Sequence, residues 1–340
     1  MGFGTLRLAA AGKPLYVRRW RRLLSSSPMK PLRSALFSLV VAVCAASVRA
    51  DWQRDTASLA WTCDGAVVWK FSFDPKEGKP HFATLATGAG ADLAVVHPSD
   101  HYWHYGLWFS WKFINGVNYW EEDGPGQRSE GTTRWKLTDL NARADGSAQL
   151  HFVVTYSRPE GRIELIEQRV LRISAPAADG SYRIDWTAHF TATGSGAVLD
   201  RTPMPGEPGG KVNGGYGGLG LRLPSQPATM AVLTPTGAVT QFESDRARPF
   251  AAAIACNFGA EGRDLGGVAV VNLSGSVAAA LPWYVVNGEK MRFVCAAVLA
   301  PQPLTLAAGE PFDLHYRIVV RPAAWTAEAL AAAAAPAVAK

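Results

Sequence analysis

Apolar and polar residues alternate along much of the chain between residues 57 and 321, as expected for β-strands with one buried face. The clearest example runs from Tyr182 to Phe190, where every second side chain is apolar or aromatic. Gly, Pro, Asn or Asp separate this run from other β-rich runs at 66–73, 149–156, 267–273, 291–298 and 312–320. With almost no helical periodicity, this pattern predicts an all-β fold, a large antiparallel β-sandwich or a barrel.

Three segments depart from simple alternation. Residues 162–173 fit two patterns, because their isoleucines and Val170 also share a helical face, but strand signals on both sides favour a strand. The segment Pro203–Gly220 holds eight glycines and predicts a loop or a very glycine-rich strand. Residues 323–340 are Ala-rich, with Thr326 as an N-cap and Pro336 as a stop, and predict a C-terminal helix or tail. Since no repeat or linker is evident, we expect residues 51–322 to form a single β-sandwich domain.

The first fifty residues have the features of an export leader. They contain nine Lys or Arg and no Asp or Glu, and a basic stretch at Met29–Arg33 precedes an apolar run at 35–46. The run is too short to span a bilayer, which takes about 20 residues, and Val48-Arg49-Ala50 supplies the small residues of a signal-peptidase site. We expect a signal peptide over 29–50, cleavage after Ala50, and a periplasmic or extracellular protein. Residues 1–28 have the composition of a transit peptide, or else the chain starts at Met29.

Removal of this leader changes the charge and leaves three cysteines. Nine of the 34 basic residues belong to the leader, so residues 51–340 carry 25 Lys and Arg against 28 Asp and Glu, a formal net charge of −3. The apparent basicity therefore belongs to the leader, and nothing in the remaining sequence predicts a basic face for nucleic acid. Cys63, Cys256 and Cys295 form no C-x-x-C pair, which leaves either one disulfide with one free thiol or three buried thiols.

Residues 107–120 predict a β-hairpin. Leu107, Phe109, Trp111 and Phe113 alternate on one face, and Asn115-Gly116 is the dipeptide best suited to a two-residue type I′ turn. With this turn, Ile114 pairs with Val117, and Trp111 is expected opposite Trp120. Such aromatic pairs across two strands stabilise a sheet by about 0.2–1 kcal/mol.

Three histidines precede the hairpin within eight residues: His97, His101 and His104. They alternate with Asp100 and with the aromatic residues Tyr102, Trp103 and Tyr105. Rings that stack on a sugar and imidazoles that transfer protons or bind hydroxyl groups predict a carbohydrate site. A metal site built on H-x3-H-x2-H is one alternative, although His97-Pro98 disfavours a helix there. In the other alternative, His97 caps a turn and the other two histidines pack among aromatic residues.

Other candidate residues carry weaker signals. Gly215–Gly220 matches G-x-G-x-x-G, but no helix follows it, so a dinucleotide site is not expected, while Tyr216 remains a candidate ligand contact. On a strand, Glu167 and Arg169 would share an apolar face, as a structural ion pair or as a catalytic acid with its partner. Glu121, Glu122 and Asp123 follow the hairpin and are expected in a solvated turn.

The segment HPSDHYWHYGLWFSW followed by INGVNYW resembles the His-Pro…Asp-His-x-x-His-x-Gly-Leu-Trp-Phe pattern of a bacterial family of unknown function, labelled PmoA-like or methane oxygenase PmoA. Further similar segments are 214–222 (GGYGGLGLR) and 269–273 (AVVNL). The resemblance covers most of the mature chain. It implies an exported protein linked to glycan catabolism, with a β-sandwich related to galactose-mutarotase-like proteins. It makes His97, His101 and His104 candidate acid, base or ligand residues, with Glu167 as a second catalytic group. The oxygenase label conflicts with the sequence, because a methane monooxygenase subunit needs several membrane spans.

These observations lead to three functional hypotheses. The first is an exported carbohydrate-active enzyme, a glycoside hydrolase, lyase or epimerase-like protein, that uses histidine-assisted acid/base chemistry without a cofactor. The second is a non-catalytic carbohydrate-binding protein of the envelope, in which Trp103, Trp108 and Tyr216 stack on the ligand and Arg169 contributes a charge. The third is a metal-dependent enzyme that uses the His97/His101/His104 cluster. The sequence predicts no nucleic-acid partner and leaves the oligomeric state open.

Overall fold

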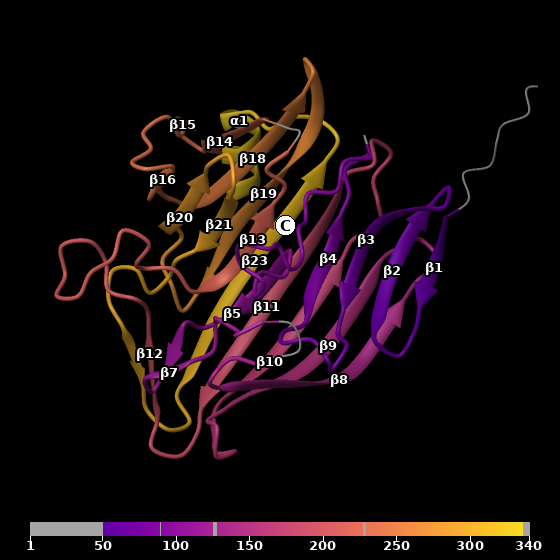
Figure 1. Cartoon of the computed structure of the whole chain (residues 1–340). Coiled ribbons are helices and arrows are strands. Elements are labelled where there is room, and N and C mark those ends of the chain that lie inside the picture. The colour runs from indigo at the N-terminus through magenta and orange to yellow at the C-terminus, as the bar shows by residue number, and fades with distance from the viewer. Residues whose placement is uncertain (1–49, 89, 125–127, 227–228, 336–340) are drawn as a thin grey trace, which may run out of the picture. The chain divides into compact units, whose positions relative to one another are not determined.

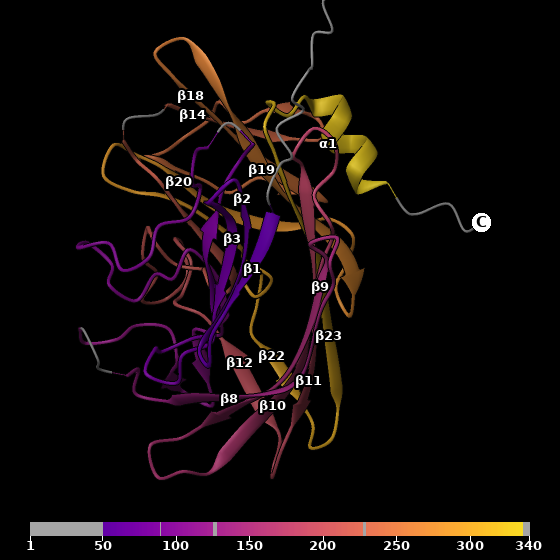
Figure 2. The same ribbon diagram turned by 90° about the vertical axis from the view of Figure 1, so that its right-hand side faces the viewer.

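The long alternating segments form two large antiparallel sheets that face each other, shown edge-on in Figure 2. The computed structural model describes residues 50–88, 90–124, 128–226 and 229–335, all within one unit, Ser47–Lys340. The expected all-β antiparallel sandwich is confirmed. The predicted leader lies outside the described residues, apart from Ala50.

The first sheet has ten strands (Figure 1). Its spatial order is β1 (Ala50–Arg54), β2 (Ser58–Cys63), β3 (Ala66–Ser72), β4 (His81–Leu85), β5 (Leu107–Ser110), β13 (Gly218–Leu223), β21 (Arg292–Ala296), β20 (Leu281–Asn287) and β16 (Arg246–Ala247), with β17 (Phe250–Ala251) also paired to β20. Strands β5, β13 and β21 are neighbours in this sheet although they are far apart in sequence. This pairing brings the histidine-rich segment beside the glycine-rich one.

The second sheet has nine strands, most of them longer. Its order is β15 (Gly237–Ala238), β14 (Thr229–Thr234), β18 (Ala253–Ala260), β19 (Arg263–Gly275), β23 (Pro311–Arg321), β11 (Tyr182–Ala192), β10 (Ile163–Ile173), β9 (Ala148–Ser157) and β8 (Thr132–Ala142). The segment with two possible patterns is therefore a strand, β10, paired on both sides. Its alternating burial follows the period of two that a sheet imposes.

A third sheet has four strands: β22 (Leu304–Leu306), β12 (Ala197–Asp200), β6 (Phe113–Ile114) and β7 (Val117–Asn118). It contains the predicted turn, because Ile114 pairs with Val117 and both turn residues have positive φ, 50° at Asn115 and 79° at Gly116. The prediction of a longer hairpin over residues 107–120 was wrong, because β5 ends at Ser110 and belongs to another sheet.

The expected pairing of Trp111 with Trp120 is also wrong. Trp111 packs in the core between the two large sheets, whereas Trp120 belongs to a separate aromatic cluster. The chain leaves the first sheet after β5, so the two tryptophans do not face each other across a ladder.

The main core fills the space between the large sheets. Aromatic rings from the two sheets meet there, with Phe71 and Phe152 at 5.6 Å and Phe109 and Phe190 at 5.4 Å between ring centroids. The predicted C-terminal helix is α1 (Ala327–Ala334), in which Thr326 Oγ1 accepts a hydrogen bond from the Ala329 amide. α1 packs against β18 and β19.

Cysteines and membrane spans can be assessed only within the described ranges. Cys63, Cys256 and Cys295 are all free thiols, so the alternative with a disulfide does not apply. Burial raises the pKa of Cys256 and of Cys295 to about 12, which keeps both thiols protonated and unreactive. In the same residues, no helix has the length and apolar character needed to cross a bilayer.

Candidate functional site

The outer face of the ten-stranded sheet carries an aromatic cluster of its own. Along β5, Leu107 and Phe109 point into the main core, so Trp108 between them points outward. On the neighbouring strand β13, Gly220 leaves room for the rings, because a Cβ there would lie 3.2 Å from both Trp108 and Phe293. The cluster comprises Trp103, Tyr105, Trp108, Trp120, Tyr216, Tyr284 and Phe293, with several aliphatic neighbours.

A pocket opens beside this cluster, with an empty volume of about 540 Å³. Its walls come from the 97–104 loop, the segment after β7, the glycine-rich loop and strands β16, β20 and β21. The lining residues are His101, Trp103, His104, Trp120, Glu121, Asn213, Tyr216, Arg246, Tyr284, Met291 and Phe293.

Half of the residues predicted from the sequence line this pocket: His101, His104, Trp103 and Tyr216. Trp108 does not, because its side chain is completely buried beneath neighbouring rings and cannot stack on a ligand. His97 lies beside the pocket lining.

Glu167 and Arg169 belong to the other sheet and do not reach the pocket. Both are fully buried on β10, where Arg169 donates from Nε and Nη2 to the two carboxylate oxygens of Glu167 at 2.6 and 2.8 Å. Tyr156 donates a further hydrogen bond to Glu167, and the Arg169 guanidinium stacks on Trp186. The Glu167 and Arg169 charges compensate each other inside the core. Of the two alternatives, a structural ion pair or a catalytic acid with its partner, the structure shows the ion pair.

Arg222, Asp100 and His101 form a connected chain at the edge of the pocket. Arg222 is buried on β13 and donates from Nη2 to both carboxylate oxygens of Asp100 at 2.9 Å. Partial burial raises the pKa of Asp100, but the hydrogen bonds from His101 and Arg222 outweigh it and hold that pKa below its usual value. The ionised carboxylate accepts from His101 Nδ1 at 3.0 Å, which leaves Nε2 of a neutral His101 with a free lone pair. This is the arrangement of a histidine base oriented by a carboxylate.

His104 is stacked between His101 and Phe293, with ring centroids 4.8 and 4.9 Å away. It is nearly completely buried, and burial, followed by nearby positive groups that include Arg222, holds its pKa well below the usual value. The ring is therefore neutral at pH 7. Its Nδ1 faces an Arg222 N–H at 3.5 Å and acts as an acceptor, so the hydrogen resides on Nε2. His104 can then donate a hydrogen bond.

Glu121 is the acidic group of the pocket and was not among the predicted site residues. Tyr216 donates to its Oε1 at 2.7 Å, Asn118 donates to Oε2 at 2.8 Å, and Lys112 forms an ion pair with it. Burial raises the pKa of Glu121, but Lys112 and these hydrogen bonds outweigh it, so the pKa lies below its usual value. Glu121 is therefore a carboxylate at neutral pH, able to accept a hydrogen bond from a ligand hydroxyl.

His97 fastens the loop that carries Asp100, His101 and His104. Its backbone N–H bonds to the His104 carbonyl, and its ring stacks on Tyr102 at 4.0 Å. Both ring nitrogens face acceptors, Nδ1 the Tyr102 carbonyl at 2.6 Å and Nε2 the Glu77 carboxylate at 2.9 Å. Burial lowers the pKa of His97, but the bonds to Glu77 and Tyr102 outweigh it and raise that pKa above normal. A doubly donating imidazolium holds the loop and is not available as a base.

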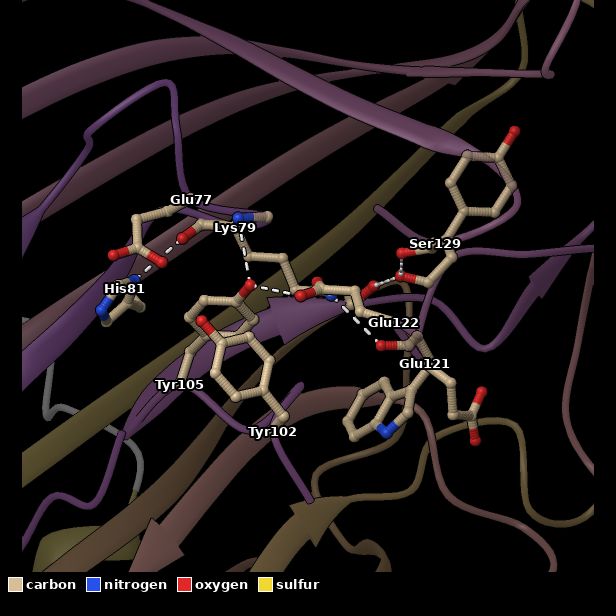
Figure 3. Close-up of polar contacts among 12 residues, drawn as sticks. Glu77, Lys79, His81, Tyr102, Tyr105, Glu121, Glu122 and Ser129 are labelled. Atoms are coloured by element: carbon tan, nitrogen blue, oxygen red, sulfur yellow. Dashed lines mark hydrogen bonds and ion pairs between the residues drawn. The ribbon is translucent and has the colours of Figure 1, made fainter. Parts of the chain in front are cut away.

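A buried polar network supports the other wall of the pocket (Figure 3). Lys79 forms an ion pair with Glu122 and donates to the Trp120 carbonyl at 3.1 Å, while Tyr105 donates to Glu122 at 2.6 Å. Figure 3 shows that Glu121 and Glu122 point in different directions. The prediction of a solvated turn was therefore wrong for both, because each carboxylate is held by a lysine from another part of the chain; only Asp123 is exposed.

The described part of the chain contains no preformed cluster of side chains for the metal site considered as an alternative. No group of three His, Cys, Asp or Glu side chains there is spaced to hold a metal ion. His97 is turned toward Glu77, and His101 toward Asp100.

Among the pocket residues missed by the sequence analysis, Arg246, Tyr284 and Phe293 come from distant strands. Nothing local in the sequence distinguishes them from other strand residues. Arg222 had a weak signal, since it ends the similar segment GGYGGLGLR. Glu121 also had a weak signal, because it is the first carboxylate after an aromatic run.

The sequence matches the pattern of DUF6807, a family of unknown function, over residues 58–335. The chain belongs to DUF6807. The expected membership in a family of unknown function is confirmed at this level. No curated protein matches the sequence.

Solved structures similar to this DUF6807 chain share little sequence with it. One, provisionally named an aldose 1-epimerase, is from Klebsiella pneumoniae; it is 9% identical over 82% of this chain and 81% of that chain, with a TM-score of 0.43. Another, the Slr1438 protein of Synechocystis sp. PCC 6803, is 11% identical over 88% of this chain and 99% of that chain, with a TM-score of 0.36.

Proposed function

We propose that this protein binds a saccharide in the pocket beside β5 and β13. We further propose that His101 transfers a proton from one atom of this ligand to another. The observation that carries the proposal is the Arg222–Asp100–His101 chain, which ends in a histidine of the pocket lining. Asp100 fixes the Nδ1–H tautomer and stabilises the imidazolium that forms when Nε2 accepts a proton. No other titratable group of the lining combines an orienting carboxylate with an open nitrogen.

The remaining lining residues suit a sugar. Trp103 and Tyr216 are partly exposed rings of the kind that stack on a pyranose face. His104 supplies an N–H donor and Glu121 a carboxylate acceptor for hydroxyl groups, and these two groups fix the orientation of the ligand. His101 then takes a proton from a sugar hydroxyl or ring carbon and returns it to another atom of the same ligand.

The test compares His101→Asn with a matched control, His189→Asn. His189 makes the same kind of contact, Nδ1 to Asp313 Oδ1 at 2.6 Å, but lies on β11 of the other sheet. The variants are incubated with glycan hydrolysates, and products and anomer exchange are followed by mass spectrometry and NMR. We expect His101→Asn to lower turnover by about 10²–10⁴-fold and His189→Asn to leave it unchanged. Unchanged turnover in folded His101→Asn would disprove the catalytic role. Saccharide binding without any product in the wild type would instead support a non-catalytic binding protein.

We also propose that the protein acts outside the cytoplasm, supported by the basic and apolar segments before Asp51 and the small residues at 48–50. N-terminal sequencing of protein expressed in a Gram-negative host checks this. Cleavage after Ala50 is expected, and an uncleaved cytoplasmic chain would contradict it. We also propose that the PmoA-like family, which the sequence resembles, is the same group as DUF6807.

A further inference from the structure

A second depression lies next to the pocket. Its empty volume is about 780 Å³, and Arg246 lines both hollows. Arg248 and Val212 border the second hollow. A ligand in the pocket that reaches Arg246 therefore lies beside the second hollow.

Arg246 and Arg248 hold their guanidinium groups at this junction. Arg246 donates from Nε to the Tyr284 hydroxyl at 3.1 Å and from Nη1 to the Ser244 carbonyl at 2.7 Å. Arg248 lies over the Tyr284 ring, 4.7 Å from its centroid, and donates from Nη2 to the carbonyls of Val212 and Gly214. These neutral partners fix both side chains and leave N–H groups of each guanidinium available.

Neither arginine has a carboxylate partner among the described residues, unlike Arg222 and Lys112 beside the pocket. Arg222 is paired with Asp100, and Lys112 with Glu121. In the part of the chain that the structure describes, Arg246 and Arg248 form no ion pair within 4.0 Å. Their sequence neighbours Glu243 and Asp245 are exposed to solvent and do not pair with them.

Both guanidinium groups are half-buried and contact Tyr284, and holding them there without a counter-ion is electrostatically costly. Burial lowers the pKa of Arg248, and the positive charge of Arg246 lowers it further. An anion bound between them removes this repulsion and forms charge-assisted hydrogen bonds, for which the planar guanidinium is well suited.

We propose that the ligand of this site is an anionic saccharide, and that Arg246 and Arg248 bind its carboxylate or sulfate group. The inference rests on the proposed function, since it places the sugar ring of the ligand in the pocket with His101. It adds the chemical class of the ligand and the residues that select it.

The test measures the affinity of the mature protein, by calorimetry, for three oligosaccharides of equal length: neutral, uronate-containing and sulfated. We expect at least one charged ligand to bind ten-fold or more tightly than the neutral one, with an affinity that falls as salt is added. The stronger of the two charged ligands identifies the anionic group. Equal affinity for all three would overturn the inference while leaving the proposed sugar site intact, and binding of none would overturn both.

Variants at Arg246 assign the effect to this residue. Arg246→Gln is expected to weaken binding of the charged ligand by about 10–100-fold, the equivalent of a charge-assisted hydrogen bond, and to weaken binding of the neutral ligand much less. Arg246→Lys keeps the charge and should recover part of the loss. The matched control, Arg263→Gln, removes an exposed arginine on β19 and should change nothing. An equal loss of both ligands in folded Arg246→Gln would contradict the inference.

Discussion

Glu167 shows how the same residue types acquire different roles from their surroundings. Glu167 and Glu121 are both ionisable carboxylates near aromatic rings, but Glu167 is enclosed between the sheets and Glu121 lines a pocket. Enclosure means that every oxygen of Glu167 must be satisfied within the protein, which Arg169 and Tyr156 achieve. Its role is therefore to keep the charge of Arg169 compensated in the core.

Glu167→Gln should destabilise the protein by about 3–5 kcal/mol, because it leaves the Arg169 charge buried without a counter-ion. Denaturant unfolding measures the change. The double variant Glu167→Gln with Arg169→Met removes both charges and should recover a substantial part of the loss. A cost below about 1 kcal/mol for the single variant, or lost saccharide binding in the folded double variant, would contradict the structural role.

At the scale of elements, the loop 97–104 depends on one ion pair at its base. His97 carries both ring protons to hold Glu77 and the Tyr102 carbonyl, and it sits at a positive φ of 51°. The loop is otherwise closed by the backbone hydrogen bond from the His97 N–H to the His104 carbonyl and by the bridge from Val96 to Tyr105. Because the loop presents His101 to the pocket, the charge state of His97 affects how firmly that residue is held.

This ion pair should make stability depend on pH in a defined direction. The raised pKa of His97 means that its contribution is complete below the usual value of 6.5 and is lost as pH rises through the folded pKa. The lowered pKa of Glu77, caused chiefly by its bond to His97, means that its contribution is lost on acidification. His97→Asn should therefore cost about 1–2 kcal/mol near pH 5.5 and less near pH 8.5.

Unfolding of wild type and His97→Asn at both pH values measures this difference, with Glu77→Gln as the matched partner. Adding Glu77→Gln to His97→Asn should cost little more than His97→Asn alone. A cost of His97→Asn that does not change between the two pH values would show that the pair is not ionic.

At the scale of the molecule, both large sheets share one core. Side chains of β23 such as Ile318 and Leu314 are fully buried in the same cluster as Leu107 and Phe109 of β5. Neither sheet can bury its inner face alone, so we expect them to unfold together.

Ile318→Ala should therefore destabilise the whole molecule by about 2–5 kcal/mol through the cavity that it leaves. Far-ultraviolet circular dichroism follows the strands, and near-ultraviolet dichroism follows the tryptophans of both sheets. The two signals should shift together to lower denaturant concentration. Separate transitions for the two signals would show that the sheets are independent units.

The sequence by itself determined what depends on neighbouring residues. Alternation placed the strands, including Tyr182–Ala192, because the side-chain period of a strand is a local property. Asn115-Gly116 determined its turn, and Thr326 the start of α1, since backbone conformation and capping act over a few residues. The grouping of histidines and aromatic rings at 97–104 indicated where a site would form.

Only the tertiary structure decided which of these side chains meet in the pocket. Trp108 and Trp103 are alike in sequence context, but sheet pairing buried the first and left the second at the pocket. Glu121, Arg222 and Arg246 reach His101 and its loop only through long-range strand pairing, which no local pattern encodes. Charge and accessibility are set by such distant neighbours, because burial and ion pairs depend on position in space. The histidine-rich segment that the sequence marked as one site is therefore divided in the fold, into His97 that fastens the loop and His101 and His104 that face the pocket.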